Sequence, residues 1–158
     1  MNDAFARLGL ARHPWIEADE VRAAFHRLAA TNHPDRAGST ADFSELTRAY
    51  EILRDPASRL RHFLAIEQPD RAPDAGIPAD LIEWFPRVAA QLQALKRGDA
   101  GDAETTLAEL TASRETAHAR IRELDANHFD ELAHALARLG FLDKWIAQLS
   151  EGLLALKL

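Results

Sequence analysis

The residues best placed to do chemistry in this chain are His33 and Asp35, which flank Pro34 in a polar segment. An imidazole and a carboxylate this close together could help to hold a metal ion or could bind a partner. Pro34 lacks an amide hydrogen and disfavours helical angles at the residue before it. A helix arriving from Val21 should therefore end near Asn32, which leaves His33 and Asp35 on an exposed loop.

The seven histidines raise the question of a metal site. His26 and His33 are seven residues apart, but Pro34 interrupts the helix that would align them. His128 and His134 are six apart, a poor spacing for two ligands on one helix. The chain has no cysteine, which excludes disulfides and cysteine-ligated zinc. We expect no metal and no cofactor. We also expect no enzyme activity, because no Ser-His-Asp order or glycine-rich phosphate loop stands out.

Two amphipathic stretches must position the loop. Val21, Phe25 and Leu28 share one face of the helix before it. The helix after it carries a similar stripe, made of Phe43, Leu46, Tyr50 and Leu53. Two apolar stripes divided by a short loop predict an antiparallel helical hairpin with the loop at its tip. The alternative is a helix-breaking turn whose polar side chains merely cap a helix or face water.

Composition excludes several classes of protein. Hydrophobic residues make up 47% of the 158 residues and charged residues 28%, which is ordinary for a globular protein. The net charge is −6, of which −1 falls in residues 1–67 and −5 in residues 68–158. A protein that binds nucleic acid needs a basic face, and this chain is acidic, so we expect no nucleic-acid partner. No apolar run approaches the ~20 residues that span a bilayer, and no signal peptide is visible, so we expect no membrane association and a cytoplasmic location.

Apolar residues also recur with the period of an α-helix in the rest of the chain. A short helix should end at Gly9, and another should start at Pro56 and end near Glu67. The proline-rich residues 68–78 predict a linker. Three further helices carry apolar seams, which include Leu81, Phe85, Val88, Leu92 and Leu95 on the first of them. The sequence therefore predicts an all-α fold, with an N-terminal domain at 1–67 and a three-helix bundle at 79–158.

The order of a short helix, a long helix, His-Pro-Asp and a second long helix, followed here from Asp3 to Arg54, resembles the J-domain. J-domains are the modules by which co-chaperones stimulate DnaK/HscA-type ATPase chaperones. The resemblance implies that Asp35 makes a charge-assisted contact with an arginine of the chaperone and that Pro34 holds the loop geometry. Hydrolysis would occur in the partner, which binds the ATP, so this chain needs no cofactor.

The same resemblance implies a basic face on the helix before the loop, which would meet an acidic surface of the chaperone. That face is thin here, because arginines replace the usual lysines and Glu20 lies close by. The alternative is a solvated helix face, since isolated surface charges contribute little. The residues assigned to the chaperone contact are His33, Pro34, Asp35, Arg22, His26, Arg27 and Arg36.

A J-domain followed by a three-helix bundle resembles HscB, the J-type co-chaperone of iron–sulfur cluster assembly. Three stretches carry the resemblance: residues 55–64, with Asp55-Pro56 and Phe63-Leu64; residues 80–85; and residues 139–144, with Phe-Leu-Asp-Lys from Phe141. The family layout implies that the bundle holds the iron–sulfur scaffold protein. The residues assigned to this client are Leu81, Ile82, Phe85 and Phe141. Alternatively, these residues pack against the J-domain.

The first bundle helix departs from the HscB pattern. The family carries several glutamates there, whereas this chain has Trp84, Phe85, Pro86, Arg87 and two alanines. Pro86 should kink or break the helix. We expect Phe141 and Trp145 to lie off the seam of the last helix and Trp84 to serve packing. The departures favour a second hypothesis, a J-domain adaptor whose bundle binds a different protein client, unrelated to iron–sulfur assembly. A third is a helical interaction module in which His-Pro-Asp is fortuitous.

Overall fold

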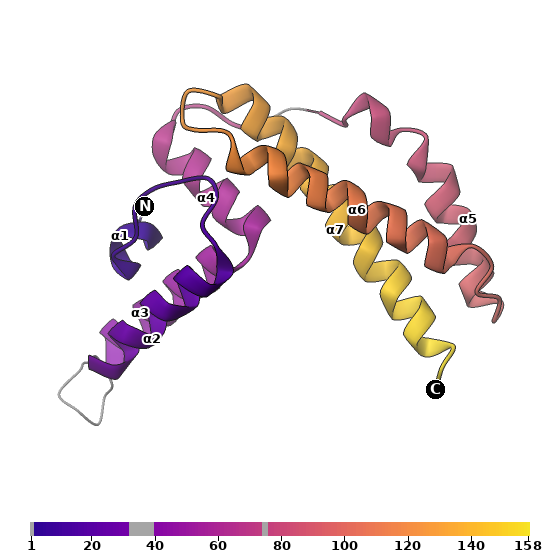
Figure 1. Cartoon of the computed structure of the whole chain (residues 1–158), viewed down its shortest axis with the longest axis horizontal. Coiled ribbons are helices and arrows are strands. Elements are labelled where there is room, and N and C mark those ends of the chain that lie inside the picture. The colour runs from indigo at the N-terminus through magenta and orange to yellow at the C-terminus, as the bar shows by residue number, and fades with distance from the viewer. Residues whose placement is uncertain (1, 32–39, 74–75) are drawn as a thin grey trace. The chain divides into compact units, whose positions relative to one another are not determined.

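The structure is a computed structural model that describes residues 2–31, 40–73 and 76–158 (Figure 1). All regular structure within these ranges is helical, which confirms the predicted all-α fold. No helix in the described part of the chain is both long enough and apolar enough to pass through a bilayer.

The chain divides into two compact units. One comprises Met1–Pro73 with Leu124–Leu132, and the other comprises Asp74–Glu123 with Ala133–Leu158. The segment that precedes and opens the last helix thus groups with the N-terminal residues. The domain boundaries expected from the sequence, 1–67 and 79–158, stay a prediction.

Local signals fix the ends of the helices in the first unit. Asp3 Oδ1 accepts two backbone N–H groups of the first turn, and Gly9 ends that helix with a left-handed φ of 65°. Pro56 opens the fourth helix, where Asp55 Oδ1 accepts the Ser58 N–H at 2.7 Å. These helices are α1 (Ala4–Leu8), α2 (Ala18–Thr31), α3 (Thr40–Arg54) and α4 (Pro56–Glu67). Their ends agree closely with those predicted from the sequence.

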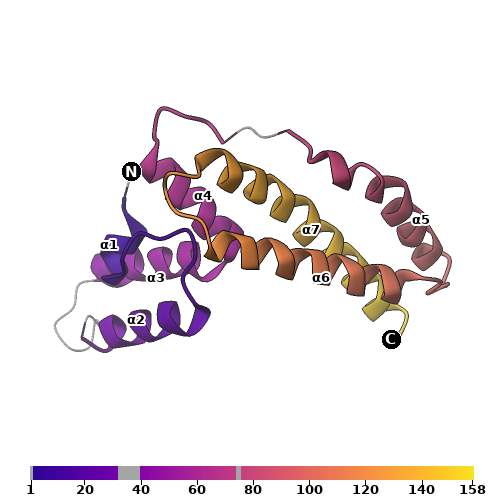
Figure 2. The same ribbon diagram turned by 45° about the horizontal axis from the view of Figure 1, so that its top comes forward.

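Helices α2 and α3 lie side by side and form the predicted hairpin (Figures 1 and 2). The rings of Phe25 on α2 and Tyr50 on α3 stack with centroids 4.5 Å apart. Helix α1 packs on α3. The buried apolar side chains of these helices and of α4 include Phe5, Leu8, Val21, Leu46, Leu53, Leu60 and Phe63. Burying such side chains contributes about 1.5–3 kcal/mol each, which holds the short α1 in place.

Among the described residues, the core of the first unit includes a buried cation, Arg59, which is 1% exposed. Its Nη1 donates to the Leu53 carbonyl at 2.7 Å, near the end of α3 where carbonyls lack helical partners. The guanidinium lies 5.1 Å from the centroid of the Trp15 ring. Burial lowers the pKa of Arg59, while the charges of Asp55 and Glu17 oppose that shift. Arg59 thus ties α4, the end of α3 and the α1–α2 connection together.

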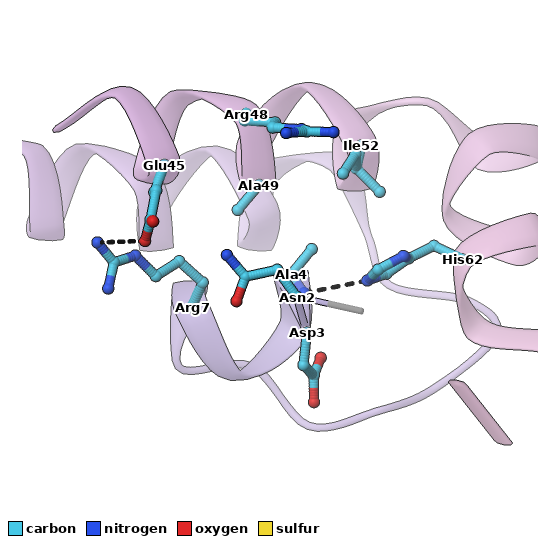
Figure 3. A pocket seen from close by; sticks show the side chains of 9 residues that line it. All are labelled: Asn2, Asp3, Ala4, Arg7, Glu45, Arg48, Ala49, Ile52 and His62. Atoms are coloured by element: carbon cyan, nitrogen blue, oxygen red, sulfur yellow. Dashed lines mark hydrogen bonds and ion pairs between the residues drawn. The ribbon is translucent and has the colours of Figure 1, made fainter. Parts of the chain in front are cut away.

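A buried histidine, His62 on α4, holds the start of α1 (Figure 3). Its Nε2 accepts the Ala4 backbone N–H at 3.0 Å, and its ring stacks on Phe5 at a centroid distance of 5.8 Å. An Nε2 that accepts carries no proton, so the neutral ring bears its hydrogen on Nδ1. Burial lowers the pKa of His62 below its ordinary 6.5, and the charge of Asp3 partly opposes this shift.

The free energy of unfolding should therefore fall as the pH drops below about 6.5, because the unfolded chain then binds a proton that folded His62 does not. In this window one such proton gives a slope of up to about 1.4 kcal/mol per pH unit. His62→Gln, whose amide oxygen can accept the Ala4 N–H without titrating, should reduce this slope. Denaturant melts of both proteins between about pH 7 and pH 5 measure the difference. Equal slopes would contradict the assignment.

Arg71, in the proline-rich stretch predicted to be a linker, contacts the start of the last helix within the first unit. Its guanidinium lies 4.2 Å from the centroid of the Phe129 ring and pairs with Asp130. Phe129 itself is buried. These contacts explain why the Leu124–Leu132 segment belongs to the first unit.

The second unit is the predicted three-helix bundle. After a 3₁₀ turn, η2 (Ala79–Leu81), come α5 (Trp84–Lys96), α6 (Ala103–Arg122) and the part of α7 (Phe129–Ala155) from Ala133 onward. All three helices contribute to one buried core. Its members include Leu81, Val88 and Leu95 from the predicted seam of the first bundle helix, Leu110 from α6, and Leu142, Leu149 and Leu153 from α7.

The first bundle helix, which Pro86 was expected to kink or break, begins as an α-helix only at Trp84. Pro86 is its third residue, after Trp84 and Phe85. The first turn of a helix has no internal acceptors for its N–H groups, so the missing amide hydrogen of proline costs nothing there. The α-helix simply begins later than the sequence pattern predicted, and residues 79–81 form a separate 3₁₀ turn. This late start also moves Phe85 off the seam, since its side chain is 38% exposed.

Gly152 lies inside α7, where glycine is unfavourable by about 1 kcal/mol relative to alanine. A β-carbon at this position would lie 2.8 Å from Leu95 Cδ1 of α5. Leu95 is buried, with 6% of its side chain exposed. The glycine thus allows a close approach between the ends of α5 and α7.

Candidate functional site

His33, Pro34, Asp35 and Arg36 lie outside the described residues. The structure does describe both helices that flank them: α2 ends at Thr31 and α3 begins at Thr40. These two helices pack against each other, and the tripeptide belongs to the residues that connect them in sequence. The assignment of the four residues to a chaperone contact stays a prediction.

The basic face predicted on α2 is exposed and weakly charged. Arg22, His26 and Arg27 are all solvent-exposed. The guanidinium of Arg22 lies 3.3 Å from the carboxylate of Asp19, one turn earlier on the same helix. Such exposed pairs contribute about 0–1 kcal/mol, so the arginine remains available to a partner. Arg22 and His26 are four residues apart and share a face.

An exposed aromatic cluster occupies one side of the second unit. The ring of Phe85 on α5 meets Phe141 and Trp145 on α7 edge-to-face, with centroids 5.5 and 5.0 Å apart. Phe141 and Trp145 are 5.7 Å apart. Phe85 is exposed and Phe141 half-buried, and Ile82, just before α5, is 59% exposed. We call Ile82, Phe85 and Phe141 the aromatic patch.

Two residues near the patch differ in burial from what the sequence indicated. Trp145 was expected to lie off the seam of the last helix, but it is 5% exposed and belongs to the bundle core. Its ring contacts the ring of Phe85 edge-to-face. Leu81, assigned to the client surface, is fully buried in the same core. Its side chain is not accessible in this structure, so the surface available to a client comprises the other three residues. Trp84 packs against the core of its own unit, with Arg87 4.8 Å from its ring centroid.

An ion pair that the sequence did not reveal fastens the segment before the patch. Arg138 on α7 donates to Asp80 in η2, two residues before Ile82. This hydrogen bond is the main cause of the lowered pKa of Asp80. The partners are 58 residues apart in sequence, so no local pattern could have paired them. The pair fastens the 3₁₀ turn that precedes Ile82 to α7.

Comparisons with known proteins agree with this geometry. Residues 3–62 match the family model of the DnaJ domain. The chaperone protein DnaJ of Prochlorococcus marinus is 42% identical over 65 residues, which cover 39% of this chain and 17% of that protein. This chain thus spans less than a fifth of the length of such DnaJ relatives.

Two matches extend over almost the whole chain. The co-chaperone protein HscB homolog of Azoarcus sp. is 25% identical, and the alignment covers 98% of this chain and 96% of that protein. The solved structure of chaperone HscB from Vibrio cholerae superposes with a TM-score of 0.75 at 16% identity, and it covers 95% and 96% of the two chains. The fold and the order of helices are therefore those of HscB. Residues 3–62 thus form a DnaJ-type domain, and the chain as a whole is similar in sequence to the HscB homolog and in fold to HscB.

Proposed function

We propose that this chain is a co-chaperone that stimulates the ATPase of a DnaK/HscA-type chaperone and presents it with a protein client. The observation that carries the proposal is the DnaJ-domain match over residues 3–62, on a hairpin whose helices end on either side of His-Pro-Asp. The chain itself breaks no bond and needs no cofactor. It changes the conformational equilibrium of its partner, which binds and hydrolyses ATP.

In this mechanism the first unit supplies charge and geometry. Asp35 accepts a charge-assisted hydrogen bond from an arginine of the chaperone, a bond about twice as strong as a neutral one. Arg22, His26 and Arg27 lie exposed on α2 and meet an acidic surface of the same partner. The net contribution of these surface charges is small, so Asp35 carries the larger share.

The client is the iron–sulfur scaffold protein. The near full-length relationship to an HscB homolog supports this assignment. The aromatic patch supplies the contact surface, since exposed apolar side chains next to one another mark binding sites. A Phe85 ring braced by Phe141 and by the buried Trp145 is already ordered, which lowers the entropy lost on binding.

A second candidate is an adaptor for a different protein client. Helix α5 contains no Asp or Glu, and its exposed positions after Phe85 include Pro86, Arg87, Ala89 and Ala90. A client that needs carboxylates on this helix would find none. Titrating the full chain into purified scaffold protein by calorimetry separates the two candidates: binding supports the first, and intact ATPase stimulation without binding supports the second.

Replacing Ile82 and Phe141 together with alanine should weaken client binding by about 2 kcal/mol or more, because apolar anchors at the centre of an interface contribute most of its energy. Stimulation of the chaperone without client should not change, since these residues belong to the second unit. Leu154→Ala is the matched control, because Leu154 is 61% exposed near the other end of α7. Normal binding by a double variant with a much lower Tm would place both residues in the core and contradict the proposed surface.

A further inference from the structure

A cation on α1 binds the first turns of α3, the helix that follows the His-Pro-Asp segment. Arg7 Nη2 lies 2.9 Å from Asp42 Oδ1 and 3.1 Å from Glu45 Oε2, and Figure 3 shows the contact with Glu45. The same nitrogen donates to the backbone carbonyl of Asp42 at 3.2 Å. Arg7 thus joins α1 to the start of α3 across 35 positions of sequence.

Helix α1 gives this arginine a fixed base. Phe5 and Leu8 are fully buried in the core of the first unit. At the start of the helix the Ala4 N–H donates to the buried His62 of α4 at 3.0 Å. These contacts fix the backbone of α1, so the guanidinium of Arg7 holds α3 against a rigid part of the unit.

The first turn of α3 is the part of that helix where such a contact has the largest effect. Its N–H groups have no acceptors within the helix, and a terminal turn opens locally at almost no free-energy cost. An exposed ion pair adds little to the stability of a whole domain, but it is comparable to the cost of opening one turn. Arg7 should therefore change the order of this turn more than it changes the Tm.

We propose that Arg7 is a positioning residue for the chaperone contact, because it fixes the turn at which the His-Pro-Asp segment meets α3. The inference rests on the proposed function. The segment must connect Thr31, the end of α2, to Thr40, the start of α3, so the place of Thr40 sets the span of the segment. The apparent dissociation constant for the chaperone then rises by the inverse of the fraction of molecules in which this turn is formed.

Amide hydrogen exchange tests the structural step on the full chain without the chaperone. In a regular helix Ser44, Glu45 and Leu46 donate to carbonyls of the first turn, so their exchange reports its opening. Arg7→Gln should speed up this exchange roughly threefold or more, as expected for the loss of an exposed ion pair. Amides of α4 should keep their exchange rates.

ATPase measurements test the functional step. Arg7→Gln should raise the concentration of this chain that gives half-maximal stimulation by roughly the same factor, while the maximal rate stays unchanged. Arg7→Lys keeps the charge and should recover part of the loss. Arg12→Gln is the matched control, because Arg12 is an exposed arginine whose pairs with Asp3 and Glu67 do not involve α3. It should change neither the half-maximal concentration nor the exchange at the start of α3.

Three results would overturn the proposal: unchanged exchange in Arg7→Gln, faster exchange without any change in stimulation, or the same loss of stimulation in Arg12→Gln. A wild-type chain that does not stimulate would overturn the proposed function and this inference together. Exchange without the chaperone distinguishes that case, because faster exchange in Arg7→Gln would still show that Arg7 holds the start of α3.

Discussion

Replacing Asp35 with asparagine should abolish stimulation of a DnaK/HscA-type ATPase while the helix content and Tm of the full chain stay almost unchanged. Asparagine keeps the size of the side chain but removes its charge, and a hydrogen bond to a charged group contributes about 1.5–3 kcal/mol. The sequence places Asp35 on a loop with little packing, so the fold should not depend on it. Single-turnover ATPase rates and circular dichroism measure the two effects.

Asp70→Asn is the matched control, because Asp70 is an exposed acid of the same unit and lies outside the hairpin. It should stimulate like the wild type. His33→Gln should behave like Asp35→Asn if the tripeptide acts as one element. A large loss of stability combined with normal stimulation would mean that the motif is structural, and the proposed function would then lose its main support.

Arg59→Ala should lower the free energy of unfolding by about 3 kcal/mol, the scale of large buried truncations. The change leaves a cavity beside Trp15 and deprives the Leu53 carbonyl of its donor. Arg59→Met should cost less, since it refills part of the cavity and buries no charge. Urea denaturation followed by circular dichroism measures both.

The control for Arg59 is its neighbour Arg61, which is exposed on the same helix. Arg61→Ala should change stability by no more than about 0.5 kcal/mol, as surface substitutions usually do. If Arg59→Ala stays within this range as well, then Arg59 does not stabilise the corner between α3 and α4.

Helix ends could be read from the sequence because their signals are local. Asp3 and Gly9 delimit α1, and Asp55-Pro56 separates α3 from α4, through contacts within a few residues. The hairpin around His-Pro-Asp could be predicted for the same reason. The stripe containing Phe25 and the stripe containing Tyr50 each repeat with the helical period, so two amphipathic helices that are neighbours in sequence pack these faces together.

The aromatic patch was only partly predictable, because its geometry depends on where α5 begins. The sequence analysis placed both Leu81 and Phe85 on the seam and on the client surface, and it expected Pro86 to interrupt the helix that carries them. The 3₁₀ turn and the late start of α5 rotate these residues relative to one another, so Leu81 is buried and Phe85 is exposed. Trp145 was misplaced for a related reason, since the core of a bundle is wider than a single seam.

The buried Arg59 and the pair between Arg138 and Asp80 were missed altogether. An arginine usually indicates a solvent-exposed position. Nothing in the sequence near Arg59 reveals that Trp15 and the end of α3 enclose its side chain. The role of His62 was missed for the same reason, since the hydrogen bond that fixes its tautomer joins residues 58 positions apart.

The close approach of Gly152 to Leu95 has a consequence for how this bundle can change during evolution. Positions 95 and 152 share one volume, so substitutions at the two are not independent. A β-carbon at 152 would improve the intrinsic helix propensity of α7, but the buried leucine at 95 must first shift or become shorter. A shorter residue at position 95 removes this contact, so the effect of Gly152→Ala on stability depends on which residue stands at position 95.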